Sequence, residues 1–344
     1  MGNPFSMTFG LEPSMLVSRV EQRDEIVGTF TDNVPANRVY ILTGVRGSGK
    51  TVMLTEISDQ FREDPSWIVV DVNPERDMLQ GFAGKLCSIP NVQQLLEKSS
   101  INLSLLGLGI TVEGAPPIAD IEAAITRMLE RLDKSKKRVL IAVDDVSNNE
   151  YMRVFTAAFQ IFLREKLPVY MLMTGLYENV ESLQNEKGMT FLLRAPKVSM
   201  RPLSMGTMAE YYARSLETDM STAIEMAHLT MGYPYAFQTL GFLCWKHKSH
   251  YKEVLTEYKL YLEEYVYRKI WSELSRKDKM IARGIASVPD GRIKVIREQL
   301  QLDTNAFNPY RERLIIKGII DGSEYGHVKF TLPFFDEFVL AQRV

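Results

Sequence analysis

Eight consecutive residues, Gly44-Val45-Arg46-Gly47-Ser48-Gly49-Lys50-Thr51, have the types and spacing that bind a chain of phosphates. Glycines let backbone N–H groups approach phosphate oxygens without a Cβ in the way. Lys50 is expected to place its ammonium between the β- and γ-phosphates, and Thr51 to offer its hydroxyl to Mg²⁺. The apolar run 39–42 before the motif predicts a buried strand. We therefore predict a nucleoside triphosphate site over residues 44–52, with Val52 as its last member.

A second apolar run, residues 139–143, ends in two carboxylates, Asp144 and Asp145. Ligands of open α/β sheets bind at the carboxyl ends of the strands. We assign Asp144 to Mg²⁺ and Asp145 to polarising the attacking water, as triphosphate hydrolysis requires. Aspartate is one methylene shorter than the commoner glutamate, so slow turnover is expected. The alternative for both residues is capping of a following helix.

These motifs, with several flanking positions, resemble a known family. The matching positions are Asn3-Pro4-Phe5, Phe9-Gly10, Arg19, residues 44–51, Asp144-Asp145, Arg194, residues 201–204 and Gly232-Tyr233-Pro234. Nearly the whole chain is similar to AAA+-related P-loop ATPases of the STAND class, the archaeal-type ATPases that are similar to replication initiators. The resemblance implies ATP as the nucleotide, with Mg²⁺. Ser18 and Asp145 depart from the family pattern, which has glycine and glutamate there.

The resemblance also implies roles for three further residues. Pro234, in a Gly-Tyr-Pro turn of the helical lid, is the candidate contact on the adenine side, or simply part of a helix cap. Thr174 ends an apolar strand where such ATPases carry a polar γ-phosphate sensor, although a threonine that merely ends the strand fits equally well. Arg194 is a candidate arginine finger acting in an oligomer, a sensor within the same chain, or a solvated surface arginine.

Alternation of strands and helices predicts an α/β fold with a parallel sheet and helices on both faces. We assign residues 1–202 to this P-loop ATPase domain, 203–271 to a helical lid, and 272–344 to a winged helix-turn-helix domain. A segment at 99–117 with alternating apolar residues predicts a short hairpin-like insertion of unknown role. A lid from a second domain would couple nucleotide binding to domain orientation.

The C-terminal pattern predicts three helices, at about 274–286, 292–300 and 305–317, and then two strands within 318–330. This order is typical of a winged helix, whose third helix reads the major groove of DNA. The candidate DNA-facing residues are Asn308, Tyr310, Arg311, Arg313 and Lys329. Acidic residues in the same region dilute its positive field, so a protein partner is the alternative.

The length and composition of the chain limit which class of protein it can be. The 344 residues exceed the size of most single cores, and the net charge of −2 predicts no strong sequence-independent affinity for DNA. Only Cys87 and Cys244 are present, and no run is long enough to span a bilayer, so we expect a cytoplasmic protein with reduced thiols and no membrane contact. The four histidines have no metal-ligand spacing, and no metal beyond Mg²⁺ is implied.

Three hypotheses follow from the sequence. The first is an Mg²⁺-dependent ATPase that acts as a switch and contacts double-stranded DNA through its winged helix. The second is the same switch with a protein partner or a second copy of the chain. The third is a nucleotide-holding scaffold with little or no hydrolysis. The trigger, the oligomeric state and the significance of hydrolysis stay open at this point.

Overall fold

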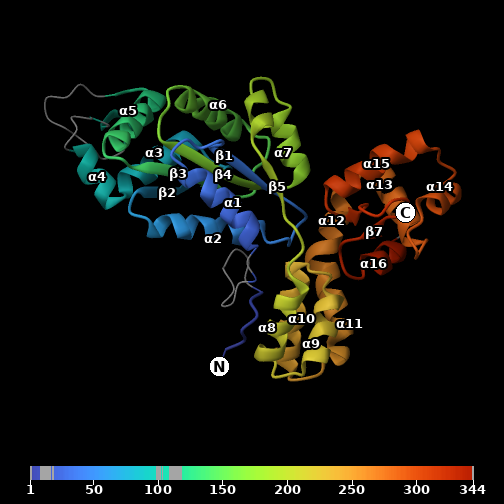
Figure 1. Cartoon of the computed structure of the whole chain (residues 1–344). Helices are drawn as coiled ribbons and strands as arrows, with labels where there is room; N and C mark the ends of the chain where they lie inside the picture. The colour runs from blue at the N-terminus through green and yellow to red at the C-terminus, as the bar shows by residue number, and fades with distance from the viewer. Residues whose placement is uncertain are drawn as a thin grey trace. The chain divides into compact units, whose positions relative to one another are not determined.

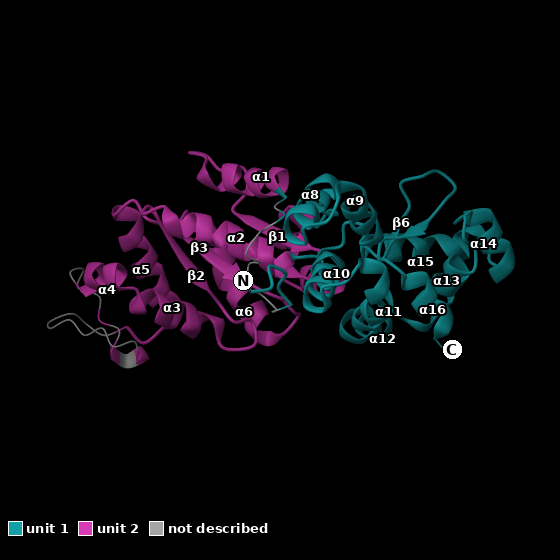
Figure 2. Ribbon diagram, turned by 90° about the horizontal axis from the view of Figure 1, so that it is seen from below, with its two compact units in different colours: residues 1–19, 44–49, 200–344 teal, residues 20–43, 50–199 magenta. Residues whose placement is uncertain are grey.

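Internal contacts divide the chain into two units (Figure 2). The computed structural model describes residues 2–7, 17, 19–97, 102, 104–107 and 118–342. One unit, here the sheet unit, comprises Val20–Thr43 and Lys50–Ser199. The other, the helical unit, comprises Met1–Arg19, Gly44–Gly49 and Met200–Val344. The predicted division at 202/203 and 271/272 into three domains is a different partition and stays a prediction.

Five parallel strands form the sheet of the sheet unit, in the order β2-β3-β4-β1-β5. Their bounds are β1 Val39–Thr43, β2 Trp67–Asp71, β3 Arg138–Val143, β4 Val169–Gly175 and β5 Lys197–Ser199. Register places Ile41 opposite Met173 of β4 and Ile141 opposite Met171. The parallel sheet predicted from the strand-helix alternation is confirmed, and the carboxyl ends of β1, β3 and β4 share one edge.

Side chains alternate between the two sheet faces, and helices cover both (Figure 1). Ile41, Ile141 and Met171 belong to one buried cluster with residues of α3, α5 and α6. On the opposite face Tyr40 and Tyr170 contact Phe30 of α1, with ring centroids 5.5 and 5.3 Å apart. The helices of this unit are α1 Val20–Thr31, α2 Lys50–Glu63, α3 Met78–Ser88, α4 Pro90–Glu97, α5 Ile121–Lys134, α6 Glu150–Arg164 and α7 Tyr177–Gln184, with the short 3-10 turns η1 Ser104–Leu106 and η2 Thr190–Arg194.

Local sequence signals set several helix starts. Asp120, Asn149 and Ser204 each accept a hydrogen bond from a backbone N–H in the first turn of α5, α6 and α8. Pro234 is the first residue of α10, where its missing N–H is not needed. Most of the predicted insertion at 99–117 lies outside the described residues, as do Phe9, Gly10 and Ser18 of the resemblance.

The helical unit is built from helices α8 Met205–Ser215, α9 Met220–Leu229, α10 Pro234–His247, α11 Tyr251–Leu262, the π-helical turn η3 Glu263–Tyr267 and α12 Arg268–Glu273. The N-terminal segment packs onto them. Phe5 is 2% exposed and contacts the rings of Tyr211, Tyr212 and Phe237. The helices expected between 203 and 271 are therefore present, and Phe5 joins their core.

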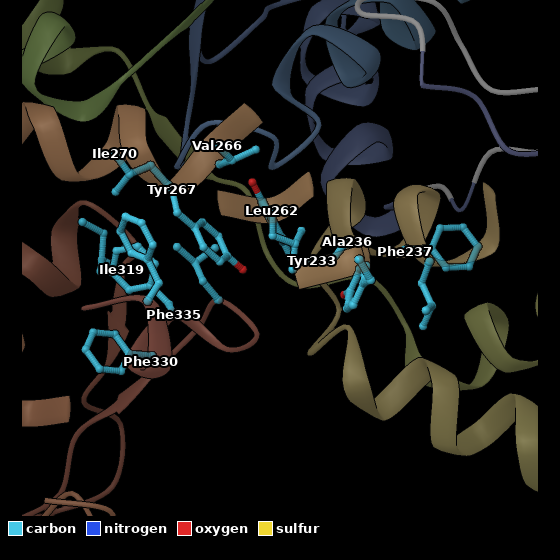
Figure 3. Packing of buried hydrophobic residues seen from close by; sticks show 14 of the residues in the cluster. Tyr233, Ala236, Phe237, Leu262, Val266, Tyr267, Ile270, Ile319, Phe330 and Phe335 are labelled. Carbon is cyan, nitrogen blue, oxygen red and sulfur yellow. The ribbon is translucent and has the colours of Figure 1, made fainter. Parts of the chain in front are cut away.

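The C-terminal segment, residues 274–344, also belongs to the helical unit. It contains α13 Arg276–Ala286, α14 Ile293–Leu300, α15 Thr304–Ile316, the antiparallel strands β6 Ile320–Asp321 and β7 Lys329–Phe330, and α16 Phe335–Ala341. The predicted order of three helices and two strands is thus observed. One hydrophobic cluster joins the segment to α10–α12, and Figure 3 shows Tyr267 beside Phe335, with ring centroids 5.0 Å apart.

No helix among the described residues is both long and apolar enough to cross a lipid bilayer.

Candidate functional site

The phosphate loop, Gly44–Gly49, follows β1, and Lys50 and Thr51 begin α2. Gly47 and Gly49 have φ angles of +73° and +87°, a region that side-chain-bearing residues rarely adopt. A Cβ on Gly47 would lie 2.3 Å from the hydroxyl oxygen of Tyr233. Glycine is therefore required at Gly47 by torsion and by packing together. Because Lys50 and Thr51 are the first residues of α2, the positive end of that helix dipole lies where the phosphates are expected.

Backbone carbonyls of the loop accept hydrogen bonds from other residues of the helical unit. The Tyr233 hydroxyl donates to the carbonyl of Arg46 at 2.5 Å, and the Tyr235 N–H donates to the carbonyl of Gly47 at 3.3 Å. Arg19 donates to the carbonyl of Ser48 at 2.9 Å and to that of Arg201 at 2.6 Å. With carbonyls held in this way, N–H groups of the loop remain the groups suited to phosphate oxygens.

Two residues of the Gly-Tyr-Pro turn thus lie at the phosphate loop. Tyr233 is 4% exposed, and its burial raises the pKa of the phenol well above the usual range, so the hydroxyl stays a donor at all physiological pH. A Cβ on Gly49 would lie 3.7 Å from Cγ of Pro234. The structure places Pro234 against the phosphate loop, and its contact with adenine stays a prediction. Contact of Tyr233 with the loop could not be expected from the sequence, because its partner Arg46 lies 187 residues away along the chain.

In the sheet unit, Thr51 and the ends of β3 and β4 form a polar cluster. The Thr51 hydroxyl lies 3.0 and 3.1 Å from the two carboxylate oxygens of Asp144. The Thr174 hydroxyl donates to Asp144 at 2.5 Å and accepts from the N–H of Asp145 at 2.9 Å. Mg²⁺ is usually held by one or two carboxylates with hydroxyl and water oxygens, so the Thr51–Asp144 pair fits this ion.

This geometry assigns Thr174 to a specific task. Its side chain is buried, with 0% exposure, and its hydroxyl proton is directed at Asp144. Thr174 therefore orients the carboxylate that is expected to hold Mg²⁺, and sensing of a γ-phosphate stays a prediction. Asp145 is exposed and has φ of +54°, a left-handed conformation that aspartate adopts more readily than most residues. Backbone strain of this kind is common at functional sites.

Arg194 is the last residue of the predicted catalytic set. Arg194 is exposed at the end of η2, next to Leu193, which is 54% exposed. Its predicted role as an arginine finger or sensor is neither supported nor contradicted by this position. Among the described residues, no three His, Cys, Asp or Glu side chains gather into a metal site.

The candidate DNA-facing residues have partners inside the protein. Arg313 donates to Asp278 at 2.5 and 2.9 Å and to the Ser275 hydroxyl at 3.1 Å, and the Asp278 side chain is only 2% exposed. Arg311 donates to the carbonyl of Gly322, in the turn that follows β6, at 3.3 Å. Arg313 thus neutralises a buried carboxylate and has a structural task, and its predicted contact with DNA stays a prediction.

The other three candidates differ in exposure. The Tyr310 ring is close to two cations, Lys277 and Arg313, which are 5.4 and 4.9 Å from its centroid. Asn308 is half-buried on α15. Lys329 is 70% exposed and lies 3.7 Å from Asp321. Lys329 is therefore the candidate whose side chain is most available to an external phosphate.

Comparisons with known proteins place this fold. Residues 264–339 match a family described as a domain of unknown function, DUF8462. No curated protein matches the chain. Among solved structures, a Walker-type ATPase of Pyrococcus abyssi is similar, with a TM-score of 0.65, 17% identity, and coverage of 94% of this chain and 96% of that one. The Aeropyrum pernix ORC2 protein, solved as ADPNP-ADP complexes, has a TM-score of 0.57, 12% identity, and coverage of 97% and 94%.

These likenesses span nearly the whole chain. The protein has the fold of AAA+-related P-loop ATPases that are similar to replication initiators, as the sequence predicts.

Proposed function

We propose that this protein is a nucleotide-controlled switch of the STAND type that binds ATP with Mg²⁺ and hydrolyses it slowly. The observation that carries the proposal is the contact of Thr51 with Asp144 directly after a complete phosphate loop. Thr51 and Asp144 would hold Mg²⁺, the loop N–H groups and Lys50 would bind the phosphates, and Asp145 would orient the attacking water. When bound, Mg²⁺ supplies positive charge that offsets the charge developing on the transferred phosphoryl group.

Three lines of support bear on this proposal. The fold is that of a Walker-type ATPase. The ADPNP-ADP complexes of the ORC2 protein show that a protein of this fold binds adenine nucleotides. The Gly-Tyr-Pro turn, one of the positions that carry the resemblance to STAND proteins, contacts the loop through Tyr233 and Pro234. Arg194, exposed on η2, would act on nucleotide in a second copy of the chain if the protein forms oligomers.

Nucleotide binding tests the proposal directly. Lys50→Ala is expected to weaken binding of a fluorescent ATP analogue more than tenfold, because it removes the charge that pairs with the β- and γ-phosphates. Asp144→Asn is expected to leave weak nucleotide binding but to abolish its dependence on Mg²⁺, while Asp145→Asn keeps binding and loses hydrolysis. Binding by Lys50→Ala as tight as that of the parent would overturn the proposal.

A second candidate function is contact with double-stranded DNA by the C-terminal segment. The order of its helices and strands and the 70% exposure of Lys329 favour it. Lys329→Ala and Asn308→Ala are the informative variants, because changes at Arg311 and Arg313 also remove internal contacts. We expect the full chain with ATP to bind DNA weakly, with an affinity that Lys329→Ala reduces and that falls with salt. If the chain binds no DNA at low salt, a protein becomes the candidate partner of this segment.

A further inference from the structure

Arg46 connects the phosphate loop to the helix that leads into the C-terminal segment. The phosphate-binding pattern leaves the residue type at Arg46 open, because backbone N–H groups bind the phosphates there. In the structure the Arg46 guanidinium donates to a single carboxylate oxygen of Glu273 through two nitrogens, at 2.8 and 3.2 Å. Glu273 is the last residue of α12, two residues before Ser275, which caps α13. One ion pair thus joins the loop to the junction between α12 and α13.

A neighbouring contact strengthens this connection. A Cβ on Gly318 would lie 3.5 Å from Cγ1 of Val45, so Val45 packs beside Gly318, which lies between α15 and β6. Two adjacent loop residues, Val45 and Arg46, therefore meet both ends of the α13–α15 helices. By its contacts the loop belongs to the helical unit, although β1 and α2 on either side of it belong to the sheet unit. Any movement of the loop must be accommodated at these contacts.

The charges around Arg46 decide how this connection responds to nucleotide. The side chains of Arg46 and Glu273 are 36% and 29% exposed, so water screens their attraction only in part. Glu273 also lies 3.5 Å from Lys269. When phosphates occupy the loop, their negative charge competes with Glu273 for the Arg46 guanidinium, and ATP competes more strongly than ADP because it carries more charge.

We infer that Glu273 acts through Arg46 to set the selectivity of the loop for the number of phosphate charges, and that binding of ATP releases Glu273 and with it the junction of α12 and α13. The inference rests on the proposed nucleotide binding. It assigns to Arg46 and Glu273 the task of transmitting the nucleotide state of the loop to the junction of α12 and α13. Because coupling between sites is reciprocal, anything that holds the junction in its Arg46-bound arrangement must weaken ATP binding by the same factor.

Affinities of the full chain for ATP and ADP test this inference. Glu273→Gln is expected to bind ATP about fivefold more tightly than the parent, and ADP about twofold, because Arg46 no longer shares its charge with the carboxylate of Glu273. The gain is expected to shrink at high salt. In an Arg46→Gln background, Glu273→Gln is expected to change ATP affinity less than twofold. Glu264→Gln, an equal charge change at an exposed position of η3, is the matched control and is expected to match the parent.

Hydrogen exchange of the same proteins tests the transmission. ATP is expected to speed exchange of residues 268–280 in the parent, and to have no such effect in Glu273→Gln, where the pair is already absent. If the parent binds no nucleotide, the proposed function itself fails. If it binds nucleotide while Glu273→Gln equals the parent, or while Glu264→Gln gains as much as Glu273→Gln, the inference is overturned and the proposed function stands.

Discussion

A buried hydroxyl, that of Thr174, illustrates how single residues prepare the site. It donates to Asp144 and accepts from the N–H of Asp145, so it fixes the side chain of one acid and the backbone of the next. A hydrogen bond to a carboxylate contributes more than one between neutral groups. The position of Asp144 relative to Thr51 thus depends on a residue from a different strand, β4.

Replacing Thr174 tests this role. Thr174→Val keeps the volume of the side chain but leaves Asp144 with the Thr51 hydroxyl and without the second hydroxyl donor, and it removes the acceptor of the Asp145 N–H. We expect the free energy of unfolding of the sheet unit to fall by about 1–3 kcal/mol and ATP turnover to need more Mg²⁺. Thr174→Ser keeps the hydroxyl and is expected to resemble the parent in turnover. Denaturant unfolding and Mg²⁺ titrations of hydrolysis measure both quantities, and equal behaviour of valine and serine variants would contradict the role.

A second residue-scale prediction concerns Arg313. Arg313→Ala leaves the buried carboxylate of Asp278 without its cation, which typically costs about 3–5 kcal/mol of stability. Asp278→Asn in the same chain removes the unpaired charge and is expected to restore part of the loss. Thermal unfolding without DNA gives both values. If Arg313→Ala unfolds like the parent, the ion pair does not stabilise the fold and the structural task assigned to Arg313 is wrong.

At the scale of elements, the N-terminal segment acts as part of the helical unit. Besides its ring contacts, Phe5 is flanked by Asn3, which donates to the carbonyl of Phe242, and Pro4, whose carbonyl accepts from Tyr211. A Cβ on Gly241 would lie 2.3 Å from the Phe5 ring, so α10 needs a glycine where Phe5 packs. The Asn-Pro-Phe opening is therefore a packing element for α8 and α10.

Replacing Phe5 gives a prediction for the helical unit alone. Phe5→Ala is expected to destabilise the helical unit by about 3–5 kcal/mol, as for other buried aromatic residues. Cys244 lies in this unit and Cys87 in the sheet unit, and both are buried. Labelling of Cys244 by a thiol reagent is therefore expected to accelerate in Phe5→Ala. Cys87 is the internal control, and an equal acceleration of its labelling would show that the effect is not local.

Elements that depend on neighbouring residues could be predicted from the sequence, whereas contacts between residues far apart in the chain could not. The sequence predicts α15 at 305–317, and the structure has it at Thr304–Ile316, because Asp303 caps it and apolar periodicity extends through it despite Pro309. The motif residues Thr51 and Asp144 are likewise found together, since both follow buried parallel strands whose ends share an edge. Partners far apart in the chain, such as Arg313 with Asp278 or Tyr233 with Arg46, leave no local pattern, and their roles could not be predicted.

At the scale of the whole molecule, residues 44–51 of the phosphate-binding motif are contiguous in the sequence, and the division into units falls between Gly49 and Lys50. Gly44–Gly49 belong by contact to the helical unit, whereas Lys50, Thr51 and Asp144 belong to the sheet unit. If bound nucleotide contacts the N–H groups of the loop as well as Lys50, its binding stabilises each unit against unfolding, because binding to the folded state shifts the equilibrium by mass action. Stabilisation of each unit is thus a measurable requirement of the proposed nucleotide binding.

The two cysteines report on this requirement separately. Burial raises the pKa of Cys87 to about 11 and that of Cys244 to about 12, so near neutral pH each thiol is protonated in the folded state and reacts after local or global opening. In mild denaturant, ATP with Mg²⁺ is expected to slow labelling of both cysteines by at least about tenfold at saturating ATP, and Lys50→Ala is expected to abolish the protection of both. Protection of Cys87 alone would mean that bound nucleotide does not engage the residues of the phosphate loop that pack with Tyr233, and the coupling proposed for Arg46 and Glu273 would then have no physical basis.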